Sequence, residues 1–188
     1  MNDTIDAILM ASGYGRRFGA NKLLAPYAGK PMARHTIDLI LDIRLQAACI
    51  VNVFFVAADP AVHSLASGLP DITLIENKHP ELGQRESIRL GAERSTSDYM
   101  IFFPCDQPML DAETVLNLIE ARVHGAICRP EFRGVPGSPV LFSSEYRAEL
   151  CSLGEGEHGR DIIKRHPQAL VRVKASSSEA LIDFDKPV

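Results

Sequence analysis

Residues 5–22 read IDAILM-ASGYGRRFGANK, an apolar run that passes directly into a loop rich in glycine and basic residues. The apolar residues of positions 5–10 predict a buried strand. The loop that follows holds three glycines, two arginines and a lysine. Glycine lets backbone N–H groups approach phosphate oxygens, while arginine and lysine supply the opposing charge. The stretch therefore predicts a strand followed by a loop that binds a polyphosphate.

Two well-known phosphate-binding loops do not fit this stretch. A Walker A loop needs Gly-Lys followed by Ser or Thr, whereas Gly29-Lys30 is followed by Pro31. A dinucleotide fingerprint needs G-x-G-x-x-G, and the third glycine here comes one residue late. A plain glycine-rich turn with solvated charges is the remaining alternative.

Strand patterns alternate with helical patterns along the first two thirds of the chain. Strands are predicted at residues 5–10, 50–57, 72–75, 99–104, 126–128, 140–142, 170–173 and 180–184, and helices at 32–47, 86–93, 111–124, 144–153 and 160–165. This order predicts an α/β fold with three layers, α/β/α, around a mostly parallel, Rossmann-like sheet. A hairpin-like stretch at 130–142 interrupts it, and residues 1–188 are expected to form a single domain.

Composition narrows the classes of partner. The chain of 188 residues is 46% hydrophobic with a net charge of −4, which argues against nucleic acid or an anionic membrane as partner. The longest apolar run, residues 49–58, is too short to span a bilayer, and an acidic start does not suit a signal peptide. The expected compartment is the cytoplasm. Scattered cysteines and histidines indicate neither a zinc site nor a dithiol.

A carboxylate follows the apolar strand at 99–104. In a parallel sheet, ligands bind beyond the carboxyl ends of the strands, so Asp106 is placed to coordinate Mg²⁺ at nucleotide phosphates. The alternative, a capping role, is better filled by Asp111 at the start of the next helix. Cys105 has no base placed beside it and is interpreted as a buried filler of the strand end.

Residues 10–22 resemble the signature L-A-[AG]-G-x-[GS]-x-R-[MF]-G-x-x-K of nucleotidyltransferases that act on the molybdenum cofactor and on related sugar-phosphate substrates. The resemblance implies the nucleotide-diphospho-sugar transferase fold. It also implies that the main chain at Ala11 and Ser12 faces the base, that Gly13 and Gly15 line the triphosphate, and that Arg17 and Lys22 hold its charge.

Further elements resemble the same family across nearly the whole chain. Residues 77–91 resemble an element beside the base and ribose, which implies Asn77 and Ser87 as nucleotide contacts. Residues 132–142 resemble a hairpin that borders the pterin substrate, and residues 156–160 resemble a substrate-side element with Glu for Asp and one residue missing. The implied acceptor contacts are Gly134, Pro136, Gly137, Pro139 and Arg160.

The final resemblance lies at residues 181–187, where Asp183 is either a second metal ligand or an edge-strand carboxylate. The family implies attack by a terminal phosphate on the α-phosphorus of a nucleoside triphosphate, with Arg17, Lys22 and Asp106 as catalytic residues and Mg²⁺ or Mn²⁺ as cofactor. The Ala11-Ser12-Gly13 start is nearer the cytosine pattern Ala-Ala-Gly than the guanine pattern Ala-Gly-Gly. The resemblance thus implies transfer of CMP from CTP to the terminal phosphate of molybdopterin.

Three alternatives stay open at this point. The same residues serve guanylyl transfer to the molybdenum cofactor, or nucleotidyl transfer to a sugar or polyol phosphate. The altered element at residues 156–160 also leaves room for a carrier without turnover, which delivers molybdenum cofactor to a partner molybdenum hydroxylase.

Overall fold

The structure is a computed structural model that describes residues 3–13 and 21–184. Its main sheet has eight strands, ordered β10-β7-β9-β6-β1-β4-β5, with β8 paired to β7, and a second, two-stranded sheet joins β2 to β3. The strands are β1 (Ile5–Ala11), β2 (Pro26–Tyr27), β3 (Lys30–Pro31), β4 (Ile50–Ala57), β5 (Ile72–Glu76), β6 (Tyr99–Pro104), β7 (Ile127–Phe132), β8 (Val135–Pro136), β9 (Val140–Ser143) and β10 (Leu170–Lys174).

The direction of the strands confirms the predicted mostly parallel sheet. β1 pairs in parallel with β4 and β6, β4 with β5, and β7 with β10. β9 runs antiparallel between β6 and β7, and the short β8 pairs antiparallel with β7. The interruption therefore falls where the hairpin was predicted, and it inserts one reversed strand into the sheet.

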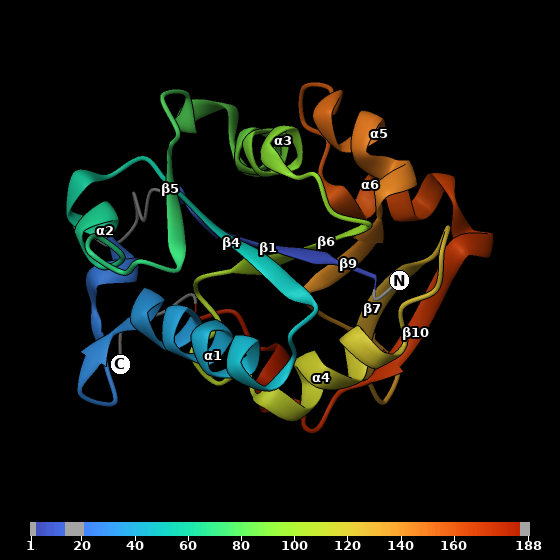
Figure 1. The fold of residues 1–188 in the computed structure, drawn as a ribbon, viewed down its shortest axis with the longest axis horizontal. Helices are drawn as coiled ribbons and strands as arrows, with labels where there is room; N and C mark the ends of the chain where they lie inside the picture. Colours follow the sequence, from blue (N-terminus) through green and yellow to red (C-terminus); the bar gives the residue numbers. More distant parts are fainter. Residues whose placement is uncertain (1–2, 14–20, 185–188) are drawn as a thin grey trace.

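Helices cover both faces of the sheet (Figure 1). On one face lie α1 (Met32–Gln46) and α4 (Ala112–Glu120); on the other lie α3 (Gln84–Arg94), α5 (Arg147–Cys151) and α6 (Gly159–Arg165), while the short α2 (Pro60–Ser64) follows β4. Single 3₁₀ turns are η1 (Lys22–Leu24), η2 (Pro80–Leu82), η3 (Ser144–Tyr146), η4 (Pro167–Ala169) and η5 (Glu179–Leu181). The predicted three-layer α/β/α fold is confirmed. None of the helices in the described ranges is long and apolar enough to cross a membrane.

The central strand β1 is buried on both of its faces. Ile5 and Leu9 belong to the core beneath α1 and α4, whereas Ile8 belongs to the core beneath α3. A strand with helices on both sides needs apolar residues at consecutive positions, which is why residues 7–11 form a continuous apolar run without alternation.

The same pairing brings two loops together. β1 and β6 lie in parallel register, with Met10 opposite Pro104, and the Cys105 N–H donates to the Met10 carbonyl at 3.2 Å. The glycine-rich loop and the Asp106 loop therefore leave the sheet at the same edge.

One predicted strand is wrong. Residues 180–184 form the turn η5 and an irregular segment that pairs with no strand. The Phe184 N–H donates to the Asp106 carbonyl at 2.8 Å, and the Gln107 side chain donates to the Leu181 carbonyl at 3.4 Å. Because the loop after β6 takes up these backbone groups, the segment does not extend the sheet.

Candidate functional site

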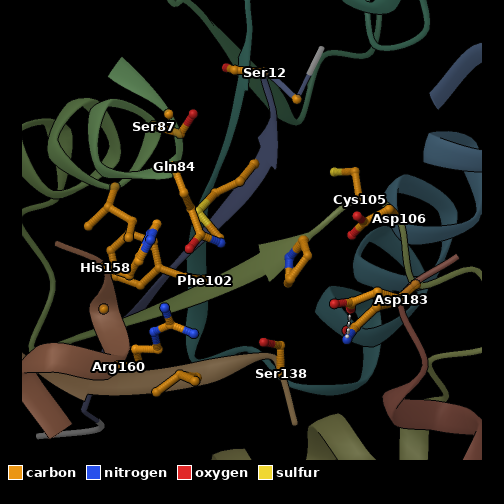
Figure 2. Close-up of a pocket in the computed structure, with 18 of the residues that line it drawn as sticks. Ser12, Gln84, Ser87, Phe102, Cys105, Asp106, Ser138, His158, Arg160 and Asp183 are labelled. Atoms are coloured by element: carbon orange, nitrogen blue, oxygen red, sulfur yellow. Dashed lines mark hydrogen bonds between the residues drawn. The ribbon is translucent and has the colours of Figure 1, made fainter. Parts of the chain in front are cut away.

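A cavity of about 840 Å³ lies at the carboxyl ends of β1 and β6 (Figure 2). The glycine-rich loop, α3, the loop after β6, the connection from β8 to β9, α6 and the C-terminal segment all contribute to its wall. Its size lies near the upper end of the roughly 300–1,000 Å³ typical of small-molecule sites. The cavity is therefore large enough for a small-molecule ligand.

The structure gathers most of the predicted site residues around this cavity. Those that line it are Ser12, Gly13, Lys22, Ser87, Asp106, Pro136, Gly137, Arg160 and Asp183. Four others do not line it: Ala11 and Pro139 are buried, Asn77 is buried behind Ser87, and Gly134 lies in the exposed β7–β8 turn. Gly15 and Arg17 lie outside the described residues.

Lys22 is positioned by a short capped turn. Asn21 precedes η1, and its Oδ1 accepts from the Leu23 N–H at 3.1 Å while its Nδ2 donates to Asp59 Oδ2 at 3.0 Å. The hydrogen bond from Asn21 is the largest cause of a lowered pKa of Asp59, so this anchor stays ionised. Asp59 also caps α2 through the Ala61 N–H. The end of the glycine-rich loop is thus tied to the element after β4.

A close ion pair crosses the cavity floor. Lys22 Nζ lies 2.7 Å from Asp106 Oδ2, and the two side chains are 15% and 21% exposed. Partly buried pairs of this kind are screened less by salt than surface pairs are. The structure therefore brings a cation from the first loop and an anion from the β6 loop into contact.

Gln107 joins the loop after β6 to the C-terminal segment. Its Nε2 donates to Asp183 Oδ1 at 2.8 Å, and Gln107 itself is 2% exposed. Figure 2 shows the Asp106 and Asp183 carboxylates on the same side of the cavity. The second carboxylate is thus held in the site by a loop contact, without any strand.

These two carboxylates suit a hard divalent cation. No group of three or more His, Cys, Asp or Glu side chains within residues 3–13 and 21–184 is arranged to hold a metal ion. Mg²⁺ is commonly bound by one or two carboxylates together with substrate phosphates, and it keeps several waters. Asp106 and Asp183 fit that pattern, whereas a site made by protein ligands alone would not fit.

The wall made by α3 depends on a close helix–strand approach. Asn77 Nδ2 lies 3.5 Å from Ser87 Oγ, and Asn77 Oδ1 accepts from the His79 N–H at 2.9 Å, so the end of β5 orients Ser87. A Cβ added at Gly91 would lie 2.4 Å from Cγ2 of Ile8. Glycine at this position lets α3 pack directly onto β1 and keeps Ser87 at the cavity.

Ser12 takes a fixed orientation at the end of β1. Its Oγ donates to the Val56 carbonyl of β4 at 3.2 Å. The hydroxyl is thus bound to the neighbouring strand, and the side chain takes up space in the cavity wall that a glycine would leave open.

Cys105 is not arranged as a nucleophile. It is 1% exposed, and burial, together with the adjacent Asp106 charge, raises the pKa of its thiol well above 9.0. A protonated thiol is a poor nucleophile. The geometry agrees with the interpretation of Cys105 as a filler.

Pro136, Gly137 and Ser138 form one wall of the cavity, here called the hairpin wall. This wall also packs against the C-terminal segment. A Cβ added at Gly137 would lie 2.8 Å from Cβ of Leu181, so the hairpin and the turn η5 are in direct contact there. Figure 2 shows Ser138 at this wall and Arg160 and His158 on the side away from Asp106.

Sequence reasoning missed several cavity residues. Gln84, Gln107, Arg129 and His158 line the cavity but were given no role. The clearest available signal was Arg129, since an arginine between the buried Cys128 and Pro130 is a charge inside an apolar strand. Gln107 offered a weaker signal, because it directly follows the predicted metal ligand.

A cavity beyond the carboxyl ends of parallel strands, with a lysine–carboxylate pair in it, is typical of the ligand site of an α/β enzyme. Residues 7–170 match the MobA-like NTP transferase domain. The chain belongs to this family of nucleotidyltransferases, which confirms the family that the sequence resembles.

Known proteins agree with this assignment. A molybdenum cofactor guanylyltransferase from Shewanella putrefaciens is 29% identical over 142 residues, which are 73% of this chain and 67% of the relative. In three other relatives of that name the match spans 55% to 58% of their length. A nucleotidyl transferase from Methanothermobacter thermautotroptrophicus matches with a TM-score of 0.81 at 19% identity, over 98% of this chain and 93% of that one.

A third comparison includes a metal. Rv0371c from Mycobacterium tuberculosis H37Rv in complex with manganese matches with a TM-score of 0.67 at 20% identity, over 92% of this chain and 89% of that one. At this level of identity the similarity establishes the shared fold.

Proposed function

We propose that the protein transfers CMP from CTP to the terminal phosphate of molybdopterin, in the form of the molybdenum cofactor, and releases pyrophosphate. The observation that carries the proposal is the Lys22–Asp106 pair, 2.7 Å apart in a cavity of about 840 Å³. The family supports nucleotidyl transfer, and the names of the curated relatives support the molybdenum cofactor as acceptor.

The choice of CTP rests on Ser12. Its side chain, bound to the Val56 carbonyl, narrows the cavity where the base would lie, and this favours a pyrimidine over the larger guanine. GTP is the second candidate, because the relatives compared above are named guanylyltransferases. In either case Asn77 orients Ser87 toward the base and ribose, and the main chain at Ala11 and Ser12 faces the base.

The chemistry needs little more than positioning and charge. An oxygen of the acceptor phosphate forms a bond to the α-phosphorus, and the bond from that phosphorus to the pyrophosphate oxygen breaks. The attacking group is already an anion, so no general base is required. Gly13 lines the triphosphate in this proposal, and Lys22 neutralises the leaving pyrophosphate. Gly15 and Arg17, from the part of the loop outside the described residues, are proposed to act with them.

The proposed cofactor is Mg²⁺ or Mn²⁺, held by Asp106 and Asp183. A divalent ion bound there supplies Lewis-acid polarisation of the α-phosphate. The hydrogen bond from Gln107 to Asp183 keeps the second carboxylate oriented toward the cavity. The manganese complex of Rv0371c shows that a protein of this fold binds such an ion.

The acceptor would lie along the hairpin wall. Pro136, Gly137 and Arg160 line this part of the cavity, while Gly134 and Pro139 shape the hairpin from positions outside the lining. In this proposal residues 1–188 act as a single nucleotidyltransferase domain in the cytoplasm, where nucleoside triphosphates are made. A molybdenum hydroxylase is the proposed recipient of the product.

The test is pyrophosphate release from purified protein with Mg²⁺, molybdenum cofactor and each of CTP, GTP, UTP and ATP in turn. Release with CTP alone supports the proposal. Release with GTP alone replaces it with the guanylyl reaction. Release only when a sugar or polyol phosphate is the acceptor overturns the molybdenum cofactor, and nucleotide binding without release indicates a carrier.

Variants connect the assay to the geometry. Lys22→Ala and Asp106→Asn should each lower turnover by at least about 10²-fold, the usual effect of losing charge stabilisation in a transition state. Lys164→Ala is the matched control, because its side chain is 69% exposed on α6 and does not line the cavity. Near-normal turnover in either site variant removes that residue from the mechanism.

A further inference from the structure

The cavity lining includes two arginines, and the reaction proposed above gives neither of them an anionic partner. Arg129 of β7 and Arg160 of α6 both line the cavity. A third arginine, Arg172 of β10, lies directly opposite Arg129 in the parallel register of the two strands. Arg129 and Arg160 thus line one cavity from two separate elements, and Arg172 lies beside Arg129 on the neighbouring strand.

Arg129 has an unusual environment for an arginine. It is half-buried, and its Nε has no hydrogen-bond partner. The nearby carboxylate, Glu131, contacts Arg172 Nε at 3.4 Å. Burial first, and then the charge of Arg172, lower the pKa of Arg129, so both disfavour the positive charge where it stands. An anion placed against this guanidinium would remove that penalty.

Arg160 lines the cavity as well. Its guanidinium is directed into the cavity beside Phe102 and His158, on the side away from Asp106 (Figure 2). Within residues 3–13 and 21–184, neither Arg160 nor Arg129 forms an ion pair. Lys22, which would hold the leaving pyrophosphate, is in contact with Asp106 on the other side.

Paired guanidinium groups match the geometry of an oxyanion. Each presents planar, paired donors and stays charged at any ordinary pH, so two of them in one cavity favour an anionic partner over a neutral one. The reacting phosphate of the acceptor must lie near Asp106, where the nucleotide α-phosphate would be. An anion at Arg129 and Arg160 is therefore a second group.

We propose that Arg129 and Arg160 form an anion subsite for a second anionic group of the acceptor, an oxyanion or metal-oxo group remote from the phosphate that reacts. The acceptor part of this inference rests on the proposed function, whereas the anion subsite itself does not. Arg129 is in this view a specificity-determining residue, which selects acceptors that carry negative charge at both ends.

The direct test is binding of molybdate, a tetrahedral oxyanion, by isothermal titration calorimetry. The protein is first saturated with Mg²⁺ and the non-hydrolysable analogue α,β-methylene-CTP, so that its triphosphate site is filled. Arg129→Gln and Arg160→Gln should each weaken molybdate binding by about 10- to 100-fold, the range for loss of a charged hydrogen bond. Arg129→Lys keeps the charge and should restore part of the affinity.

Arg165→Gln is the matched control. It lies on the same helix as Arg160 but pairs with Glu157 at 2.7 Å and does not line the cavity, so molybdate binding should not change. Arg160 is exposed, so its variant tests the subsite even if Arg129→Gln fails to fold. Equal molybdate affinity in wild type and Arg160→Gln overturns the subsite.

Kinetics separates this inference from the proposed function. With an active acceptor, Arg129→Gln should raise the KM for the acceptor by about 10- to 100-fold and leave the KM for CTP unchanged. A raised KM for CTP instead would overturn the assignment to the acceptor. If molybdenum cofactor supports no turnover and the arginine variants still lose molybdate, the proposed function fails and the anion subsite stands.

Discussion

Replacing Gly91 with alanine should destabilise the protein, although the same change in most helices has the opposite effect. Alanine is favoured over glycine in a helix interior by about 1 kcal/mol. At Gly91 the added Cβ would lie 2.4 Å from Cγ2 and 2.9 Å from Cγ1 of Ile8. Carbon atoms in contact prefer about 3.5–4.0 Å, so α3 and β1 would have to separate by roughly 1 Å.

That separation is costly because both partners are fixed. Ile8 is fully buried on the central strand, with β4 on one side and β6 on the other. Overpacking a core of this kind costs about 1–3 kcal/mol. After the gain in helix propensity is subtracted, we expect a net loss of up to about 2 kcal/mol in the free energy of unfolding. The displacement would also move Ser87 and raise the KM for the nucleotide.

The assay is urea unfolding followed by circular dichroism, on a double-mutant cycle. Ile8→Ala removes the two nearest atoms and leaves only its own Cβ at 3.2 Å, so Gly91→Ala should cost less in an Ile8→Ala background than in wild type. Gly159→Ala is the control, because its Cβ would meet its nearest neighbours at an ordinary 3.7 Å. If Gly91→Ala stabilises the protein as helix propensity alone predicts, the close approach of α3 to β1 is refuted.

Three further predictions follow from other contacts. Asp6→Ala should cost about 3 kcal/mol or more in urea unfolding, because it leaves the buried hydroxyls of Ser95 and Ser97, which donate to the carboxylate at 2.7 and 2.8 Å, without an acceptor. Hydrogen bonds from Arg89 lower the pKa of Glu86, so ionised Glu86 stabilises the fold at pH values above its pKa in the unfolded state. The difference in the free energy of unfolding between wild type and Glu86→Gln should therefore shrink as the pH falls below about 4.5. Cys105→Ala should keep turnover within about 10-fold of wild type, since a buried, protonated thiol takes no part in nucleophilic attack, and a larger loss would show a direct role.

The part of the fold that was predictable depended on local pattern. The run at residues 5–10 and the carboxylate after 99–104 each identify a strand end, and topology places parallel strand ends together. Lys22 and Asp106 therefore meet in the structure although 84 residues separate them. No local pattern determines which strands are neighbours in the sheet. The helical crossovers between the strands determine that order.

What could not be predicted depends on contacts between distant segments. Residues 180–184 have the composition of a strand, yet the loop after β6 takes the backbone groups that a sheet would use. Asp6 is an isolated acid in an apolar run, and its partners on β4 and in the turn after α3 are 46 to 91 residues away. Gly91 has a steric reason that only the packing against Ile8 reveals.

Lys22 and Asp106 are proposed to bind different ligands, yet their side chains are in contact. In the structure each neutralises the other at 2.7 Å, so neither leaves an unpaired charge in a partly buried site. A triphosphate bound together with a divalent cation would give each residue a new partner, phosphate oxygens for Lys22 and the cation for Asp106. Binding of the triphosphate alone, or of the cation alone, would break the pair and leave the charge of the other residue uncompensated. The geometry therefore favours binding of the nucleotide as its metal complex, which is also the form in which its α-phosphate is most readily attacked.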